Sequence, residues 1–451
     1  MRRLPLEGIR VLDLTRVVAG PFLTKQLADL GAEVIKVESI QVPDETRYQR
    51  VLPAWPDNRP GDRPWNSTWY FNNHNRNKYG ITVDIASELG QTIIRRLAAI
   101  SDVVADNYRP GVLEKVGLDY ESLRKVAPDI IAISLSGFGD TGPWRTFRAY
   151  GTTVEFMSGL ASLTGYPGGD VSPTGQPYGD WCSAMIGTTA VLMALHYRRR
   201  TGRGQRIDLS ESEAVSSLIG AELLGCQLTG EVPPRVGNRH PSMAPHGYFP
   251  CAGPDRWIGI AIRSDEEWQA FARFFGHPEL GDDPRFATLA ARKANEEELE
   301  RLVSAWTAGW EAEALFHELQ QRGIAAAPVS SARQVLLDPH LRARDYFQRV
   351  EFRPDRQMPP LWFAKNPIVF NNERPGIRFP APDLGEHNHV ILRDLLGISD
   401  EEIEVLALTD VIGTAPLAPF DFSPTDIALL QQQGAVADAD PEYRRTLGLD
   451  P

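Results

Sequence analysis

The sequence IRVLDLTRVVAGPFLTKQLADLGAEVIKV, residues 9–37, contains the elements that decide the fold. Its apolar runs at 9–14 and 34–37 have the composition of short buried strands, and residues 21–30 between them have a helical pattern, with Pro21 in the first turn and Gly31 as the stop. A strand, a helix and a second strand in this order predict a βαβ unit. The turn at residues 17–21 lacks the three-glycine dinucleotide fingerprint, so NAD binding is not supported.

Strand and helix patterns continue to alternate along the next hundred residues. We predict strands at 81–84, 103–105 and 130–135, and a helix that Ser87 caps and that runs to Ile100. This alternation predicts a parallel α/β sheet, and each strand leads into a loop that contains Asn, Arg, Lys or Gly. Crevices at the carboxyl ends of parallel strands are the usual ligand sites. Residues 38–71 have no periodicity and are rich in Pro, Trp, Asn and Arg, which predicts a surface excursion or an active-site rim.

Asp180 stands between a loop rich in glycine and proline, residues 165–177, and a long apolar run. The run from Cys182 to Tyr197 predicts a buried helix that ends at Gly202, which places Asp180 at the helix N-terminus. Asp is a preferred N-cap residue, and capping is the commoner role at such a position. A carboxylate beside a loop-lined pocket can also be a nucleophile, held ionised by the helix dipole and free backbone N–H groups. One residue can serve both roles, and the local sequence leaves both open.

Composition excludes several classes of protein. The 451 residues suffice for two or three domains, and 42% hydrophobic with 24% charged residues is ordinary for a globular protein. The net charge of -12 argues against a general nucleic-acid binder. Three widely spaced cysteines form neither a disulfide framework nor a metal-ligand pattern, and we expect no metal site. Without a signal-type apolar core or a run of about twenty apolar residues, the sequence predicts a cytoplasmic protein that does not enter the membrane.

A series of motifs at the strand ends resembles the family III CoA-transferases, the group of formyl-CoA transferase and crotonobetainyl-CoA:carnitine CoA-transferase. Each motif alone is weak, but the series covers most of the chain in order, which makes the resemblance specific. The motifs are LDLTRVVAGP (12–21), LADLGAEVIKVE (27–38), NRNK (75–78), NYRPG (107–111), SGFG (136–139), TGP (141–143), RRTGRGQ (199–205), GNRH (237–240) and PDLGEH (382–387).

The resemblance implies an α/β fold with two domains. The large, Rossmann-like parallel-sheet domain is expected to be discontinuous, with its N-terminal part at 1–224 and a return segment at 326–451 that includes a C-terminal extension. The smaller α/β domain is expected at 225–325. In this family such a discontinuous domain accompanies an interlocked homodimer, so the resemblance also implies that assembly.

The resemblance also implies an activity, that of a CoA-transferase of the EC 2.8.3 type, with Asp180 as its nucleophile. Asp180 would attack an acyl-CoA thioester to form a mixed anhydride, the CoA thiolate would convert it to an aspartyl-CoA thioester, and a small carboxylic acid would accept CoA. Coenzyme A is thus expected as part of the substrate, with no permanently bound cofactor. The implied CoA contacts are Val18, Ala19, Arg76, Asn77, Lys78, Asn107, Tyr108, Arg109, Lys115, Ser136, Gly137, Phe138 and Gly139.

The chain departs from the family pattern at three places. Many members carry an arginine after the VIKVE stretch, where this sequence has Ser39 and its nearest arginines are Arg47 and Arg50. Residues 57–70 and the tail beyond Gly413 are longer than the resemblance implies.

Two other functions fit a chain of this kind. The α-methylacyl-CoA racemases share the fold and use a His roughly thirty residues before the Asp as part of an acid/base pair. Here that region is Arg148–Thr152 and contains no His, which disfavours a racemase. A non-catalytic CoA-binding protein is the third possibility, and it would bind CoA without exchanging it.

Overall fold

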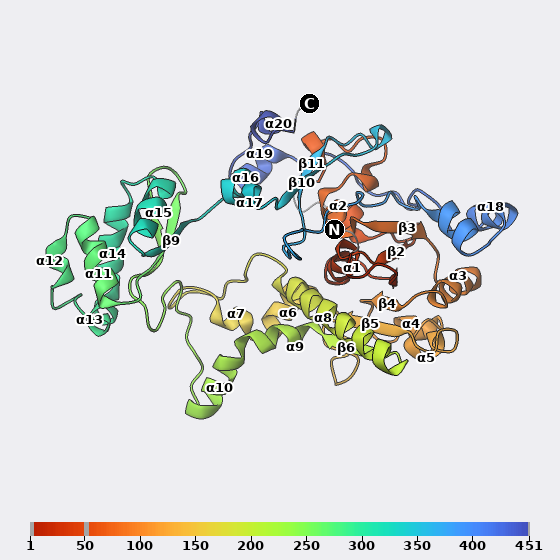
Figure 1. Cartoon of the computed structure of the whole chain (residues 1–451), viewed down its shortest axis with the longest axis horizontal. Coiled ribbons are helices and arrows are strands. Elements are labelled where there is room, and N and C mark those ends of the chain that lie inside the picture. Colours follow the sequence, from red (N-terminus) through yellow and green to blue (C-terminus); the bar gives the residue numbers. More distant parts are fainter. Residues whose placement is uncertain (1–3, 49–53, 450–451) are drawn as a thin grey trace. The chain divides into compact units, whose positions relative to one another are not determined.

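The computed structural model describes residues 4–48 and 54–449, so Arg50 lies outside the described residues. Contacts divide the chain into two compact units. The first unit comprises the chain up to Leu160, Thr174–Ala221 and the chain from Leu336 onward, and the second comprises Ala161–Pro173 and Glu222–Val335. Figure 1 follows the chain by colour. The predicted domain boundaries after residues 224 and 325 stay a prediction.

A six-stranded parallel sheet forms the centre of the first unit, with the order β3-β2-β1-β4-β5-β6. This order confirms the predicted parallel α/β class and equals that of the Rossmann fold. Strands β2 and β3 lie on one side of β1, and β4 lies on its other side. The strand order therefore reverses between β1 and β4. The strands are β1 Arg10–Asp13, β2 Glu33–Glu38, β3 Lys78–Thr82, β4 Val103–Asp106, β5 Ile131–Ser136 and β6 Arg206–Ser210.

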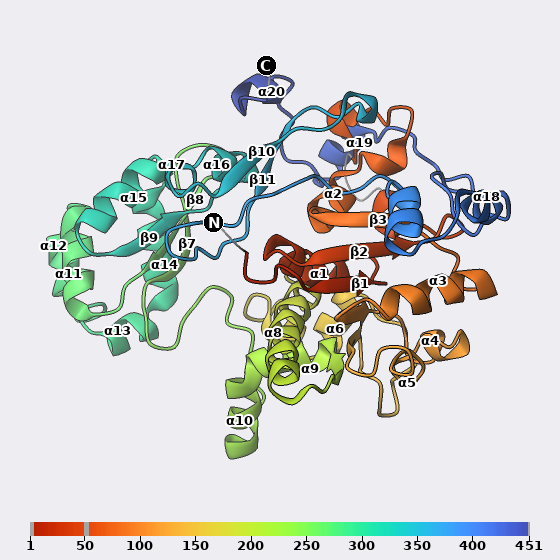
Figure 2. The ribbon, with the colours of Figure 1, turned by 45° about the vertical axis from the view of Figure 1, so that its right-hand side comes forward.

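Side chains alternate between the two faces of this sheet and enter two separate cores. On β1, Val11 packs with α1 (Ala19–Asp29) and α8 (Tyr178–Thr201), whereas Leu12 packs with α3 (Glu88–Ala98) and the C-terminal helix α18 (Asp400–Leu408). Helices α1 and α8 lie side by side, as Figures 1 and 2 both show. The near-continuous apolar character of the strands follows from this burial on both faces.

The remaining helices and strands of the first unit are mostly short. They are α2 Trp69–Asn75, α4 Val112–Lys115, α5 Tyr120–Leu123, α6 Gly151–Met157, α9 Glu211–Ser216, α17 Pro339–Ala343, β10 Phe347–Val350, β11 Leu361–Ala364, the π-helix Val390–Leu395, α19 Ile427–Gln432 and α20 Tyr443–Thr446. Three helices contain the boundaries between the units: α7 Leu160–Leu163, α10 Gly220–Thr229 and α16 Ala332–Leu337.

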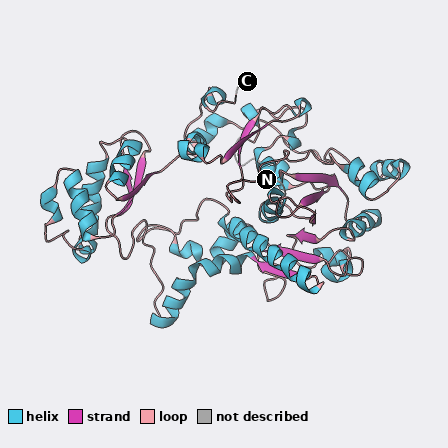
Figure 3. Ribbon diagram, viewed as in Figure 1, coloured by secondary structure: helices cyan, strands magenta, loops and turns pink. Residues whose placement is uncertain are grey.

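The second unit packs helices against a three-stranded antiparallel sheet around its own core (Figure 3). Trp268, Phe271 and Leu315 are fully buried in this core. The elements are β7 His246–Pro250, β8 Trp257–Ala261, α11 Asp265–Phe274, α12 Pro278–Gly281, α13 Leu289–Ala294, α14 Glu296–Thr307, α15 Ala312–Gln321 and β9 Ala325–Pro328. Three amphipathic helices, α11, α14 and α15, contribute their apolar faces to this core.

One strand begins earlier than predicted. The sequence places Lys78 in a loop before a strand at 81–84, but β3 begins at Lys78, which pairs with Val34 of β2. The Nζ of Lys78 lies 3.0 Å from the Asp13 carboxylate at the end of β1, and this buried ion pair holds Lys78 in the sheet. The loop assignment was therefore wrong for this residue.

The excursion and the C-terminal tail, both longer than the resemblance implies, pack on each other. Trp55 and Trp65 contact Phe422, and the Asn58 side chain exchanges two hydrogen bonds with the backbone of Thr425. Part of the described excursion thus contacts the tail, while Asp57, Arg59 and Asp62 are exposed. Within the described residues, no helix is long and apolar enough to cross a membrane.

Candidate active site

A cavity of about 440 Å³ opens in the first unit at the carboxyl ends of β1, β4, β5 and β6. Its position at the reversal of the strand order is the usual ligand site of an open α/β sheet. The volume lies within the range of small-molecule pockets. The lining residues are Arg16, Val17, Glu45, Asn107, Tyr108, Arg109, Pro110, Val112, Leu135, Ser136, Gly137, Arg145, Phe147, Arg148, Ala149, Tyr150, Gly151, Asp180 and Glu211.

Asp180 lies in this cavity as the third residue of α8. The helix begins at Tyr178, and Pro177 occupies the N-cap position without a side-chain hydrogen bond. The interpretation of Asp180 as the N-cap residue is therefore wrong, because the helix starts three residues earlier than an N-cap at Asp180 predicts. Asp180 is still in the first turn, where the helix dipole favours a negative charge.

The residue after Asp180 fixes the start of α8. Trp181 stacks on the His74 ring at 5.2 Å between centroids and meets the Phe22 ring edge-on at 4.7 Å. His74 is fully buried, and burial, with the nearby charge of Lys25, lowers its pKa to about 3. It is neutral at physiological pH. The aromatic contacts join α8 to α1 and α2, which positions Asp180 against the first turn of α1.

The Asp180 carboxylate is buried and is held by backbone groups. Asp180 is 9% exposed, and its carboxylate accepts hydrogen bonds from the N–H of Ala19, the first residue of α1, and from its own N–H. Burial raises its pKa from 3.8 to about 6, while these hydrogen bonds oppose the rise. The carboxylate is therefore mostly ionised at pH 7 and more basic than an ordinary aspartate, which strengthens it as a nucleophile.

Gly151 makes room for this carboxylate. A Cβ built at Gly151 would lie 2.0 Å from the Oδ2 of Asp180, far inside van der Waals contact. Any side chain at this position would displace the carboxylate from its present place. Gly151 precedes Asp180 by about the distance in sequence at which the racemases carry their His.

Glu211 is a second carboxyl in the same cavity. It is the first residue of α9, directly after β6, and it is 8% exposed. Burial, followed by the charge of Asp180, raises its pKa from 4.5 to about 8. The cavity therefore contains two buried carboxyl groups that influence each other's ionisation.

Five of the predicted CoA contacts line the cavity: Asn107, Tyr108, Arg109, Ser136 and Gly137. Asn107 connects the loop after β4 to the loop after β1. Its Oδ1 accepts a hydrogen bond from the N–H of Arg16 at 2.8 Å, and its Nδ2 donates to the carbonyl of Arg16 at 2.7 Å. The Oγ of Ser136 is buried and has no hydrogen-bond partner among the described residues, so it is available to a ligand.

Four further predicted contacts adjoin the cavity. Val18 and Ala19 are buried at the start of α1, next to the lining residue Val17, and Ala19 bonds Asp180. The ring of Phe138 meets the lining residue Phe147 edge-on at 6.4 Å. Gly139 has a φ of +77°, which favours glycine, and a Cβ there would lie 3.3 Å from Ser210.

The predicted phosphate-binding loop at 76–78 does not reach the cavity. Arg76 pairs with Asp29 at 2.8 Å, Asn77 donates to the same carboxylate at 2.8 Å, and Lys78 bonds Asp13; all three are buried. A basic side chain that is buried and fully paired stabilises the fold and is not placed to bind a phosphate. These three residues are thus part of the packed fold and not of the cavity lining, and their role in CoA binding stays a prediction. Lys115, the last residue of α4, is exposed and does not line the cavity either.

Arg47 does not replace the family arginine that is missing at Ser39. Its guanidinium is fully buried and pairs with Glu38 at 2.7 Å, while the Oγ of Ser39 donates to Gln41 at 2.6 Å. Neither residue lines the cavity.

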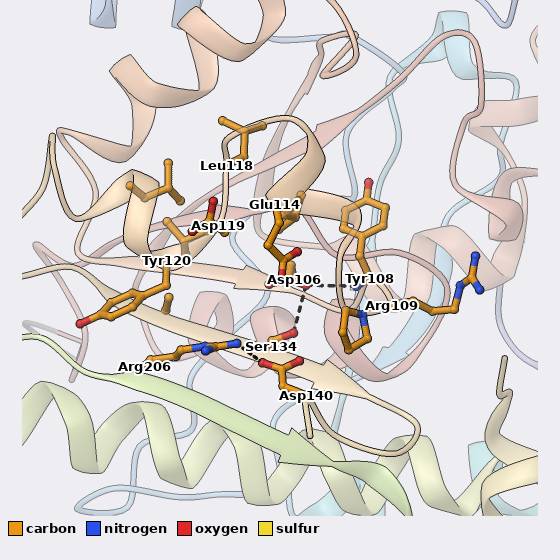
Figure 4. Close-up of a pocket in the computed structure, with 15 residues that line it drawn as sticks. Asp106, Tyr108, Arg109, Glu114, Leu118, Asp119, Tyr120, Ser134, Asp140 and Arg206 are labelled. Carbon is orange, nitrogen blue, oxygen red and sulfur yellow. Dashed lines mark hydrogen bonds and ion pairs between the residues drawn. The ribbon is translucent and has the colours of Figure 1, made fainter. Parts of the chain in front are cut away.

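A smaller hollow of about 50 Å³ lies on the other side of the loop after β4 (Figure 4). Asp106 accepts hydrogen bonds there from the N–H of Tyr108 and the Oγ of Ser134, and burial raises its pKa to about 7. Arg206 pairs with Asp140 nearby. The hollow is too small for a nucleotide, and its carboxyl groups would repel phosphate.

Sequence reasoning found Asp180 and five implied CoA contacts but missed other lining residues, among them Arg16, Arg145, Arg148, Gly151 and Glu211. Arg16 follows the first predicted strand, so the rule that ligands bind at the carboxyl ends of parallel strands could have found it. Arg145, Arg148, Gly151 and Glu211 carry no comparable signal, because only the folded loops bring them to the cavity. In the described part of the chain, no group of three or more His, Cys, Asp or Glu side chains could hold a metal ion.

The chain is similar to known CoA-transferases over most of its length. The model of CoA-transferase family III matches residues 6–388. The chain is 36% identical over 409 residues to succinyl-CoA–D-citramalate CoA-transferase of Chloroflexus aurantiacus, covering 90% of this chain and 98% of that protein. It is 34% identical over 396 residues to succinate–glutarate CoA-transferase of Agrobacterium fabrum, covering 87% and 96%.

A solved structure has the same fold. The chain superimposes on a CAIB/BAIF family protein from Brucella suis with a TM-score of 0.79 at 34% identity, covering 87% of this chain and 100% of the other. Relatives named for CoA transfer match nearly the full length of the family region. The chain thus belongs to CoA-transferase family III and is a CoA-transferase.

Proposed function

We propose that this enzyme moves CoA from an acyl-CoA thioester to a free carboxylic acid with Asp180 as its nucleophile. The observation that carries the proposal is the place of Asp180: it is buried in a cavity at the strand-order reversal, bonded by the N–H of Ala19, with a pKa raised to about 6. A carboxylate needs a water-poor site to attack a thioester, because hydration lowers its nucleophilicity and water would hydrolyse an anhydride. The cavity supplies that site.

The proposed reaction proceeds through successive acyl-transfer steps at Asp180. An Asp180 oxygen attacks the thioester carbonyl, the C–S bond breaks, and a mixed anhydride and the CoA thiolate form. The thiolate attacks the aspartyl carbonyl, which releases the donor acid and leaves an aspartyl-CoA thioester. The acceptor acid then repeats these steps in reverse and regenerates Asp180. Each tetrahedral intermediate carries an oxyanion, for which the Ser136 hydroxyl and the backbone N–H groups beside it are suitable donors.

The arginines of the cavity suit the phosphates of CoA. Arg109, Arg145 and Arg148 are exposed, and Arg16 is half-buried, so their guanidinium groups remain available for charge-assisted hydrogen bonds. We expect Arg109→Ala to weaken binding of CoA by about 1.5–3 kcal/mol. Binding of pantetheine, which lacks the phosphates, should be nearly unchanged. Isothermal titration with both ligands measures the difference, and equal losses would assign Arg109 to the shape of the pocket.

The racemase alternative loses support at Gly151. A racemase needs a second acid/base group facing the α-carbon. At the corresponding place this chain has Gly151, where a Cβ would lie 2.0 Å from Asp180 Oδ2 and a side chain has no room.

Adduct trapping tests the proposal and separates the alternatives. Wild-type enzyme incubated with succinyl-CoA and no acceptor, then treated with hydroxylamine, should carry a hydroxamate at Asp180 that peptide mass spectrometry locates. Succinyl-CoA is the first donor because both relatives above are named for succinyl or succinate transfer. A racemase would form no adduct and would exchange the α-proton with deuterated solvent. A binding protein would do neither.

We also propose that the enzyme is a homodimer. Helix α8 carries apolar residues on its exposed side as well as its buried side: Met185, Ile186 and Leu192 are more than a third exposed, and Met193 is 67% exposed. A helix that is apolar all round is normally buried. A second copy of this chain is the occupant that the family resemblance supports for this face.

A further inference from the structure

Glu211 and Asp180 are held in the same cavity by firmly packed elements. Ser210 of β6 is in register with Ser136 of β5, and the N–H of Ser212 donates to the carbonyl of Gly137 at 3.0 Å. These contacts fix the first turn of α9 at the loop that lines the cavity. One turn later, α9 packs against α8, where a Cβ at Gly179 would lie 3.4 Å from Val215.

Like the buried Glu155, the two carboxyl groups lack, within the described residues, the ion pair that four other buried acids of this unit form. Asp13, Asp29, Glu38 and Asp44 each pair with a buried Lys or Arg at 2.7 to 3.1 Å. Within residues 4–48 and 54–449, neither Asp180 nor Glu211 has an ion pair. Two buried carboxyls without ion partners that share one cavity disfavour each other's ionisation near neutral pH, because neither charge is compensated.

We infer that Glu211 works as the protonated partner of Asp180, so that the pair holds one proton and one negative charge while CoA is transferred. This inference rests on the proposed function of Asp180. Glu211 thereby sets the charge of the cavity and provides a hydrogen-bond donor for the anionic group that forms there.

The pKa values agree with this division. The pKa of Asp180 is raised to about 6 and that of Glu211 to about 8, so between these values Asp180 is the ionised member and Glu211 the neutral one. Because the two groups are coupled, each value belongs to the pair.

The movement of negative charge during transfer explains why a neutral Glu211 beside Asp180 favours the reaction. Anhydride formation moves one negative charge from Asp180 to the CoA thiolate, and the next step returns it to the departing carboxylate. The total charge of the cavity stays constant, and the Glu211 proton can donate to each of these anions in turn. An ionised Glu211 would add a second charge and repel every one of them, as well as the incoming acceptor carboxylate.

Other titratable groups face the pair from the surrounding elements. The groups are Arg16 after β1, Glu45 from the segment before α2, Tyr108 and Arg109 after β4, and Arg145, Arg148 and Tyr150 from the loop before α6. Arg109, Arg145 and Arg148 are exposed, so solvent screens their effect on Glu211.

The pH dependence of transfer tests the inference. For wild type, kcat/KM should fall above an apparent pKa of about 8 as Glu211 loses its proton. Glu211→Gln cannot ionise, so its rate should be several-fold lower at pH 7 and show no such decline. Glu211→Leu removes the donor, and its rate should fall by a further factor of about 100. Glu213→Gln makes the same substitution at an exposed position of α9 and should keep the wild-type profile.

A spectroscopic measurement tests the proton itself. The infrared spectrum of wild type minus that of Glu211→Gln should contain a protonated-carboxyl stretching band at pH 7 that disappears as the pH rises through about 8. The subtraction removes other buried carboxyl groups such as Asp106. The matched spectrum of Glu213→Gln should show no difference.

The outcomes separate this inference from the proposed function. If wild type transfers CoA but Glu211→Gln keeps the alkaline decline and the band is absent, the role of Glu211 is refuted and Asp180 stands. If wild type forms no adduct, the proposed function fails, and the infrared band alone decides whether Glu211 holds the proton. A rate for Glu211→Leu equal to that for Glu211→Gln would also overturn the donor role.

Discussion

Replacing Asp180 by Asn should abolish transfer and at the same time stabilise the folded protein. Asn keeps the size of the side chain and an oxygen for the N–H of Ala19, but a neutral amide cannot form the anhydride. The stabilisation has a different origin. An ionised carboxylate buried in a water-poor cavity without an ion pair costs folding free energy, and Asn removes that cost.

The raised pKa gives the magnitude. A change of one pH unit in pKa corresponds to about 1.4 kcal/mol. The rise from 3.8 to about 6 therefore corresponds to roughly 3 kcal/mol at neutral pH. We expect a measured gain of about 1–2 kcal/mol, because the buried amide retains part of the desolvation cost.

The pH dependence has a defined sign. The pKa of Asp180 is higher in the folded protein than in the unfolded chain. The protonated carboxyl therefore makes its full contribution to the free energy of unfolding below about pH 4, and this contribution is lost as the pH rises through about 6. The stability of Asp180→Asn relative to wild type should therefore increase from pH 4 to pH 7 and then level off. A purely structural carboxylate with a lowered pKa would give the opposite slope.

Two measurements on the same preparations decide the outcome. Urea unfolding at fixed protein concentration, followed by tryptophan fluorescence from pH 4 to pH 8, gives the stability difference. Mass spectrometry of CoA exchange gives the activity. Glu213→Gln, an exposed carboxylate-to-amide change, is the control and should alter neither. Near-normal transfer by Asp180→Asn would refute the role of Asp180 as the nucleophile. A loss of stability at pH 7 would refute the claim that its buried charge costs folding free energy.

Three further substitutions test other parts of the structure. Gly151→Ala places a Cβ 2.0 Å from Asp180 Oδ2, so we expect at least a hundredfold loss of kcat in exchange assays with little change in the unfolding midpoint; unchanged kcat would contradict the close approach. Lys78→Met leaves Asp13 buried without its partner and should cost about 3–5 kcal/mol of stability by urea unfolding, whereas a selective loss of CoA affinity would restore the phosphate-binding interpretation. Met193→Glu places a charge on the exposed apolar face of α8 and should yield monomers in sedimentation velocity, and an unchanged dimer would place the interface elsewhere.

The sequence by itself determined the parallel sheet and the neighbourhood of the site. Strand-like runs that alternate with helices require crossover connections, and such connections produce parallel pairing with ligand sites at the carboxyl ends of the strands. Asn107, Ser136 and Gly137, which the resemblance implies as CoA contacts, follow predicted strands and line the cavity, in agreement with that rule. The order of the motifs, through the resemblance, identified Asp180.

Tertiary structure alone decided which charged residues are exposed at the cavity and which form buried ion pairs within the fold. Lys78 and Arg109 look alike in the sequence, since both lie near a strand end and follow an Asn. Lys78 is buried because β3 starts at that residue and its side chain meets Asp13 two strands away, whereas Arg109 stands in a loop after the end of β4 and stays exposed. The pairing of Glu211 with Asp180 likewise depends on β6 lying beside β5 and on α9 packing against α8. Such pairings join residues through neighbouring strands and helices, and a side chain's charge and pKa depend on those neighbours, which local sequence patterns do not specify.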